Sequence, residues 1–193
     1  MCGRYQFSME QCEEIQRIAQ AIDKKYGMDA WRPGEICPSA AAPVLLGGRN
    51  GLHVSLTSWG YPATGHLVIN ARAESAAEKP MFRESVANRR CVIPSTGFFE
   101  WDTEKKKYFF KLPGEPILYM AGLWTKYQGR PCYTILTTAA NASMQPIHDR
   151  MPVVLPRSKL QAWLEDSSAS EEMLRTVPPE LEVSACDAQL RLW

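Results

Sequence analysis

Five strand-like segments follow one another between residues 91 and 138, and they constrain the fold more than any other feature of the sequence. Each segment is short and rich in β-branched or aromatic residues, and turn-forming or charged residues separate it from the next. They read CVIP, GFFEW, KYFFK, ILYMAGLW and CYTILTT. Successive strands with short connections pair antiparallel, so this region predicts a largely antiparallel sheet.

Helical spacing of apolar residues is found at the margins of this region. The first such segment starts at Ser8, which has capping-box spacing to Gln11, and Gly27 is the expected stop. A second segment covers residues 73–89 and is broken at Pro80. The other expected elements are an irregular connection over 31–42, an alternating strand over 52–56, a buried strand over 67–71, and helices over 157–165 and 170–176. We therefore predict one α+β domain over residues 1–193 with a mostly antiparallel, closed sheet.

Composition and charge limit the possible functions. Hydrophobic residues make up 45% of the 193 residues, charged residues make up 22%, and the net charge is +1. We expect a globular protein whose overall charge attracts neither nucleic acid nor membranes. The six cysteines form no CxxC pair and no cluster with histidine, so we predict no metal site and no cofactor. The sequence shows no signal peptide and no membrane-spanning run, and we expect a cytoplasmic protein.

The N-terminus reads MCGRY, and removal of Met1 would make Cys2 the first residue. An α-amine has a pKa of about 7.7 to 8.0, so roughly a tenth to a sixth of it is neutral at pH 7, against about 0.04% of a lysine. This amine can attack an aldehyde to form an imine, and the neighbouring thiol can close on the imine carbon. The product is a thiazolidine ring, which neither a lysine nor an internal cysteine can form.

Polar residues inside otherwise apolar segments are further candidates for chemistry. They are Asn70 after LVI, Glu100 in GFFEW, and His148 before MPVVL. Burial among aromatic rings would raise the pKa of Glu100 and suit it to proton transfer, whereas alternation along the strand would point it to solvent. The alternative for His148 is a hydrogen-bonded loop histidine, and the alternative for Asn70 is a turn or capping residue.

Five blocks of the sequence together resemble one known family. They read MCGRY, SWGYP, INARAES, PMFRESVANRRCVIPSTGFFEW and IHDRMPVVL, and they extend from residue 1 to residue 155. They are similar to the motifs of the SOS response-associated peptidase (SRAP) family, the abasic-site-processing proteins. The resemblance implies a β-rich, barrel-like core with peripheral helices and a basic channel for single-stranded DNA. It also implies a monomer that associates with the nucleoid when bound to damaged DNA.

The resemblance implies that the protein cross-links itself to abasic sites. Met1 would be lost by autoproteolysis, a peptidase activity, and Cys2 would then trap the ring-opened aldehyde of an abasic site in single-stranded DNA as a thiazolidine. By motif position, Glu100 would be the general acid and base for this lyase-type chemistry and its reversal. His148 would assist opening of the deoxyribose ring, and Asn70 would orient Cys2 or the substrate.

Four residues of the matching blocks are candidates for DNA contact. Arg4, Arg72 and Arg150 each lie two residues from a catalytic candidate and are expected to contact phosphates; the alternative for each is solvent or a carboxylate partner. Trp59 would support the DNA channel or lie in the core. Two segments depart from the family pattern: Glu35 stands where members often carry Asn, and PATGHL replaces a tryptophan-rich stretch. These departures bear on DNA unstacking and on junction preference.

Two functions of other classes are open on the sequence. N-terminal-nucleophile amidohydrolases also begin Met-Cys-Gly, and in them the thiol attacks an amide while the α-amine acts as the base. Such an enzyme would release ammonia from glutamine. A noncatalytic single-stranded DNA-binding module would bury Cys2 and form no adduct.

Overall fold

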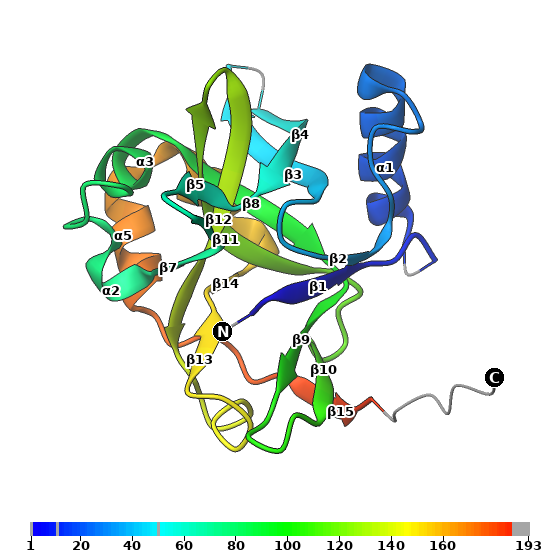
Figure 1. Ribbon diagram of the computed structural model, residues 1–193, viewed down its shortest axis with the longest axis vertical. Coiled ribbons are helices and arrows are strands. Elements are labelled where there is room, and N and C mark those ends of the chain that lie inside the picture. Colours follow the sequence, from blue (N-terminus) through cyan, green and yellow to red (C-terminus); the bar gives the residue numbers. More distant parts are fainter. Residues whose placement is uncertain (1, 11, 50, 187–193) are drawn as a thin grey trace.

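A closed barrel of five strands forms the centre of the molecule, which the computed structural model describes for residues 2–10, 12–49 and 51–186 (Figure 1). The strands follow the order β12, β4, β3, β8, β11 and return to β12; the β12–β4 pair is parallel and the other four are antiparallel. Their bounds are β3 Ala41–Gly48, β4 Gly51–Trp59, β8 Arg90–Ser95, β11 Leu118–Tyr127 and β12 Arg130–Ala139. The predicted strand-rich fold with a closed core is confirmed.

Short strands extend the barrel beside β12 and β11. Strand β7 runs parallel to β12 and β13 runs antiparallel to it, so that Thr137 of β12 is opposite both Arg72 and Pro152. Strand β14 pairs with β11, and β5 and β6 form a separate hairpin. The bounds are β5 Tyr61–Ala63, β6 His66–Val68, β7 Asn70–Arg72, β13 Arg150–Pro152 and β14 Val154–Leu155. The segment 67–71, predicted as one buried strand, is therefore divided between β6 and β7, and Leu67 is exposed.

A second sheet carries the start of the chain. Its antiparallel order is β15–β10–β9–β1–β2, with bounds β1 Arg4–Phe7, β2 Gly34–Ile36, β9 Gly97–Trp101, β10 Lys107–Lys111 and β15 Glu182–Ala185. Strand β2 and the first two residues of β3 lie within the segment 31–42, so the prediction of an irregular connection there is wrong for Gly34–Ile36 and for 41–42. Gly97 joins β8 to β9 at a φ of 152°, where a Cβ atom would meet Phe109 and the Phe110 carbonyl at 2.4 Å. Only glycine therefore allows β9 to approach β10 at this corner.

The helices pack around the two sheets. They are α1 Glu13–Tyr26, α2 Ala73–Ala76, α3 Arg83–Asn88, the 3-10 turn η1 Arg157–Lys159, α4 Leu160–Glu165 and α5 Ser167–Arg175. The predicted break at Pro80 separates α2 from α3. The predicted start at Ser8 is wrong, because Cys12 is the N-cap residue and residues 4–7 are in β1; Gln11 lies outside the described residues. In the part of the chain that the structure describes, no helix has the length and apolar character to cross a bilayer.

Candidate functional site

Cys2 lies in the interior, immediately before β1. Its side chain is 1% exposed, and its thiol is oriented towards the Arg4 carbonyl at 3.5 Å. The Asn70 side chain, from the start of β7, donates through Nδ2 to the Cys2 carbonyl at 3.0 Å. The structure therefore brings together two candidates that are 68 residues apart in the chain.

Glu100 lies on β9, which pairs with β1, and is only 3% exposed. Of the two orientations considered for this residue, the buried one is correct. Burial raises the pKa of the Cys2 thiol well above its usual range, and the charge of Glu100 raises it further. The charge of the Glu100 carboxylate therefore favours the neutral form of the Cys2 thiol.

Buried polar atoms without partners gather where β7, β12 and β13 meet. Within the described part of the chain, Asn70 Oδ1, Thr137 Oγ1 and Arg150 Nε have no hydrogen-bond partner. Leaving buried polar atoms unsatisfied costs free energy, so native proteins do so rarely and often at functional sites. Asn70 thus holds Cys2 with one end of its amide and offers the other end as a free acceptor.

Arg150 is the first residue of β13, and His148 lies two residues before it. Hydrogen bonds connect Arg150 both to His148 and to α2, the helix that follows β7. Arg150 donates to both oxygens of Glu74 in α2, at 2.7 and 2.8 Å, and to the Thr137 carbonyl at 2.7 Å. Its backbone N–H donates to His148 Nδ1 at 3.0 Å. In the neutral ring this contact places the proton on Nε2. Asp149 Oδ1 lies 2.9 Å from the same Nδ1 and can pair with it only when that nitrogen is protonated.

The remaining arginines have different surroundings. Arg4 is paired with Glu35 on β2, and Lys107 pairs with the other oxygen of Glu35 at 2.7 Å. For Arg4 and Arg150 the carboxylate partner considered above is therefore present. Arg72 is exposed, and no ion pair joins it to another described residue.

Trp59 is a core residue. It is completely buried, its indole N–H donates to the Ile69 carbonyl at 3.0 Å, and its ring stacks on Tyr133 with centroids 6.2 Å apart. The Tyr133 hydroxyl lies 2.7 Å from that of Tyr5. A ring enclosed in this way cannot stack on a base, so of the two alternatives for Trp59 the position in the core is the one that the structure shows.

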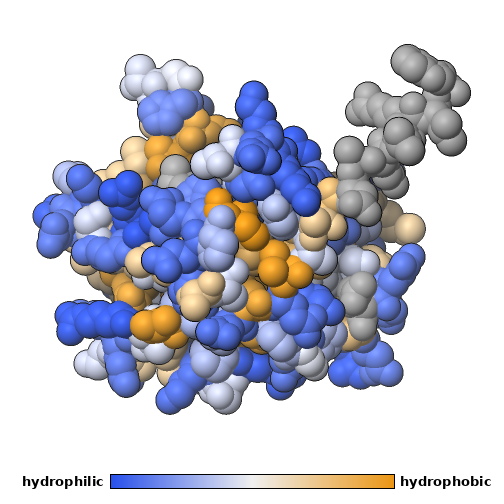
Figure 2. Space-filling model, turned by 90° about the horizontal axis from the view of Figure 1, so that it is seen from below, coloured by the Kyte–Doolittle hydropathy of each residue, from blue (hydrophilic) through white to orange (hydrophobic). Residues whose placement is uncertain are grey.

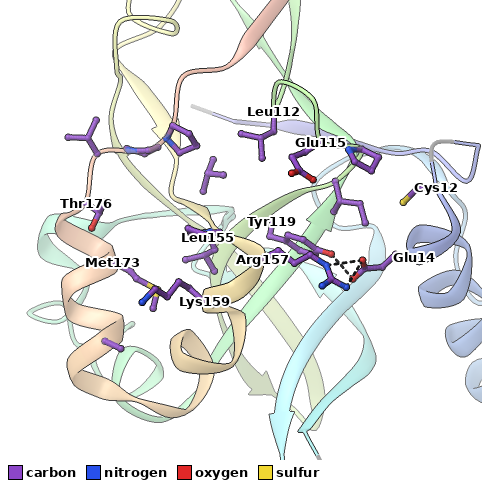
Figure 3. A pocket seen from close by; sticks show the side chains of 18 of the residues that line it. Cys12, Glu14, Leu112, Glu115, Tyr119, Leu155, Arg157, Lys159, Met173 and Thr176 are labelled. Carbon is purple, nitrogen blue, oxygen red and sulfur yellow. Dashed lines mark hydrogen bonds and ion pairs between the residues drawn. The ribbon is translucent and has the colours of Figure 1, made fainter.

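A separate cavity of about 830 Å³ opens between α1, the start of β11, β14 and α5 (Figure 3). The Tyr119 hydroxyl and the Arg157 guanidinium converge there on Glu14, at 2.7 and 3.1 Å. Burial raises the pKa of Tyr119, and Glu14 adds to the rise. None of the lining residues is among the eight predicted site residues. The lower face of the molecule is mainly hydrophilic, with hydrophobic residues in a strip near its centre and in smaller groups towards its edges (Figure 2).

Sequence reasoning missed three charged residues at the site. Glu74 stands inside the block INARAES, Glu35 is a departure from the family pattern, and Lys107 belongs to KYFFK. Their partners are 31 to 76 residues away in the chain, so no local pattern could show the pairing. Among the described residues, no group of three or more His, Cys, Asp or Glu side chains is arranged to hold a metal ion.

Comparison with known proteins gives one consistent family. The family model described as SOS response associated peptidase (SRAP) matches residues 1–190. The abasic site processing protein YoaM of Bacillus subtilis is 31% identical, over 92% of this chain and 85% of the relative. The abasic site processing protein YedK of Escherichia coli is 29% identical, over 96% of this chain and 87% of the relative.

Solved structures share the fold. A protein from Bacteroides thetaiotaomicron aligns with a TM-score of 0.77 at 23% identity, over 95% of this chain and 91% of that one. A protein from Bordetella bronchiseptica aligns with a TM-score of 0.76 at 22% identity, over 97% of this chain and 100% of that one. At these identities the structural likeness establishes the fold alone.

Proposed function

The chain belongs to the SRAP family, and from this membership and the geometry around Cys2 we propose that it processes abasic sites in DNA by covalent capture. Its relatives in Bacillus subtilis and Escherichia coli are named abasic site processing proteins. The observation that carries the proposal is the joint position of Cys2, Asn70 and Glu100. The amide holds the Cys2 carbonyl at 3.0 Å, and the carboxylate charge acts on the Cys2 thiol.

The reaction starts once Met1 has been removed and the α-amine of Cys2 is free. The neutral amine adds to the aldehyde carbon of a ring-opened abasic site, and loss of water gives an imine. The thiol then adds to the imine carbon, its proton passes to the nitrogen, and a thiazolidine closes. Each step moves a proton, and in this proposal Glu100 is the general acid and base for these transfers, because it is buried on the strand that pairs with β1 and its charge acts on the Cys2 thiol.

Asn70 and His148 act on the reactants in this proposal. The Asn70 amide fixes the Cys2 backbone, and its unpartnered Oδ1 accepts from the α-amine or from a substrate hydroxyl. The Arg150 backbone N–H leaves the proton of neutral His148 on Nε2. That N–H can donate to the deoxyribose ring oxygen and assist its opening. The raised pKa of the Cys2 thiol keeps the sulfur neutral until the imine is present.

The strand that carries the abasic site is single-stranded DNA in our proposal. Exposed Arg72 is the readiest phosphate ligand, whereas Arg4 and Arg150 must share their guanidinium groups with carboxylates. Removal of Met1 by the protein itself belongs to the same proposal, because the thiol that would act on the Met1–Cys2 bond belongs to Cys2 itself.

The experiment that tests this function measures the intact mass of the protein, to detect the loss of Met1, and then its covalent adduct with DNA. Protein whose mass shows the loss of Met1 is incubated with a single-stranded oligonucleotide that contains one abasic site. We expect a denaturant-resistant adduct from the wild type and no durable adduct from Cys2→Ser, which retains an amine but lacks the sulfur. An equally durable Cys2→Ser adduct would refute the thiazolidine, and Cys2-dependent ammonia release from glutamine would favour an amidohydrolase.

A further inference from the structure

One carboxylate on the edge strand β2 bonds two cations from other strands of the second sheet. Glu35 Oε1 accepts from Arg4 of β1, and Glu35 Oε2 accepts from Lys107 of β10 at 2.7 Å. The side chains of Arg4, Glu35 and Lys107 are 46%, 31% and 29% exposed, so this cluster lies at the surface. Burial opposes ionisation of Glu35, but the hydrogen bonds from Lys107 and Arg4 prevail and lower its pKa.

The cluster adjoins the reactive end of the chain. Arg4 is two residues from Cys2, and Lys107 Nζ lies 3.9 Å from the ring centroid of Phe99 and 5.6 Å from that of Trp101. Phe99 and Trp101 flank Glu100 in β9. Phe99 is buried, so Trp101 is the ring of the two that is accessible at this surface. A cation next to an accessible aromatic ring is typical of surfaces that bind single-stranded nucleic acid, where phosphates meet the cations and bases meet the rings.

Arg4 and Lys107 are not readily available to a DNA phosphate, because Glu35 already pairs with both. Both carboxylate oxygens are used, so both cations have an anionic partner before DNA arrives. A phosphate that approaches Arg4 or Lys107 competes with Glu35 for these cations and is repelled by the charge of Glu35. Exposed ion pairs are weak enough for such an exchange.

We infer that Glu35 is a specificity-determining residue that holds Arg4 and Lys107 until a DNA phosphate exchanges with it. The inference rests on the proposed function and extends it. Glu35 lowers the affinity for undamaged single-stranded DNA, which leaves the surface readily. DNA with an abasic site is retained because the covalent bond to Cys2 forms while the strand is present.

The test measures noncovalent binding of an undamaged oligothymidylate by Cys2→Ser protein over a range of salt concentrations. We expect Glu35→Gln to raise the affinity about fivefold at low salt, the scale of one exposed ion pair. The slope of log K against log salt should steepen by about 0.7 for each additional phosphate that the protein neutralises. Adding Arg4→Gln to Glu35→Gln should reduce the higher affinity, and adding both Arg4→Gln and Lys107→Gln should cancel it, because both released cations are then absent.

Glu182→Gln is the matched control. Glu182 of β15 pairs at 2.8 Å with Lys111, which is four residues from Lys107 on β10, so this variant makes the same change of net charge on the same sheet. It should leave affinity and slope unchanged. If both variants changed the affinity and the slope equally, net charge alone would explain the effect of Glu35→Gln, and the inference would be overturned.

Glu35→Gln could also weaken DNA binding instead of strengthening it, and this result would count against the inference. Weaker binding by Glu35→Gln, with thermal unfolding unchanged, would show that Glu35 positions Arg4 for DNA and would overturn the inference. The proposed function is checked separately by adduct formation with the Glu35-intact, Cys2-intact protein. If the adduct forms but Glu35→Gln does not raise the affinity for undamaged DNA, the inference fails and the proposed function stands. If neither an adduct nor DNA binding is observed, both proposals fail.

Discussion

The Cys2 region and the cavity around Glu14 each contain a carboxylate and a group that can lose a proton. The two carboxylates differ in whether a cation balances their charge. In the cavity, Glu14 accepts from the Tyr119 hydroxyl and from the Arg157 guanidinium, so a cation balances it. At Cys2, the charge of Glu100 acts on a buried thiol, and Asn70 Oδ1 nearby has no partner within the described residues. The comparison teaches that a carboxylate whose charge is balanced by a cation stabilises the fold, whereas a carboxylate whose charge raises the pKa of a buried thiol, near a neutral acceptor without a described partner, is suited to chemistry.

The substitution Glu100→Gln is expected to have the largest effect, which is a slower reaction with the abasic site. The amide has nearly the same shape as the carboxylate but cannot exchange protons, so adduct formation and reversal should both slow by about 100-fold or more. Loss of the Glu100 charge also removes one cause of the raised Cys2 pKa, which makes the thiol easier to ionise. A slower reaction despite a more acidic thiol would show that proton transfer is the function of Glu100. Single-turnover kinetics with the abasic oligonucleotide provide the measurement; unchanged rates in both directions would contradict the role.

The second prediction concerns stability against pH and isolates the Cys2 thiol. The folded-state pKa of this thiol is raised, so its contribution is fully present below the pKa of the unfolded thiol, about 8.5, and is lost as pH rises above it. Above this pH the wild type should lose stability relative to Cys2→Ser by up to about 1.4 kcal/mol per pH unit.

Urea unfolding of both proteins at a series of pH values from neutral to mildly alkaline measures this difference. Cys91, Tyr5 and Tyr133 also have raised pKa values, but they are present in both proteins and cancel in the comparison. A constant gap in unfolding free energy between the two proteins across the series would show that the thiol is not buried as described.

The smallest expected effect comes from Tyr119→Phe in the cavity. This variant removes the hydroxyl that donates to Glu14 and should cost about 1 to 2 kcal/mol of stability, because the bond is to a charged acceptor. Adduct formation should proceed at the wild-type rate. Thermal unfolding and the adduct assay together test the comparison; a slower adduct with unchanged stability would mean that the cavity takes part in the reaction.

Local sequence patterns predict the elements whose pairing partners are near in the chain. Alternation and turn residues predict strands β8 to β12, and the helical period predicts the apolar face of α1, where Ile15, Ile18 and Ile22 are buried. Strands β1 and β2 escape such patterns, because they are short and β1 pairs with β2 and with β9, which are distant in the chain. The predicted start of α1 at Ser8 is too early, since the helix begins after the N-cap residue Cys12.

The sequence alone determined which chemical groups this protein possesses: a cysteine that follows Met1, a carboxylate among aromatic residues, and an asparagine and a histidine in apolar segments. The tertiary structure decided which of these groups meet and what each one faces. Asn70 reaches Cys2 across 68 positions, Glu35 takes Arg4, and Trp59 is enclosed in the core. The physical reason is that burial and charge pairing depend on how sheets close on one another, and contacts between distant residues leave no periodic trace in the sequence.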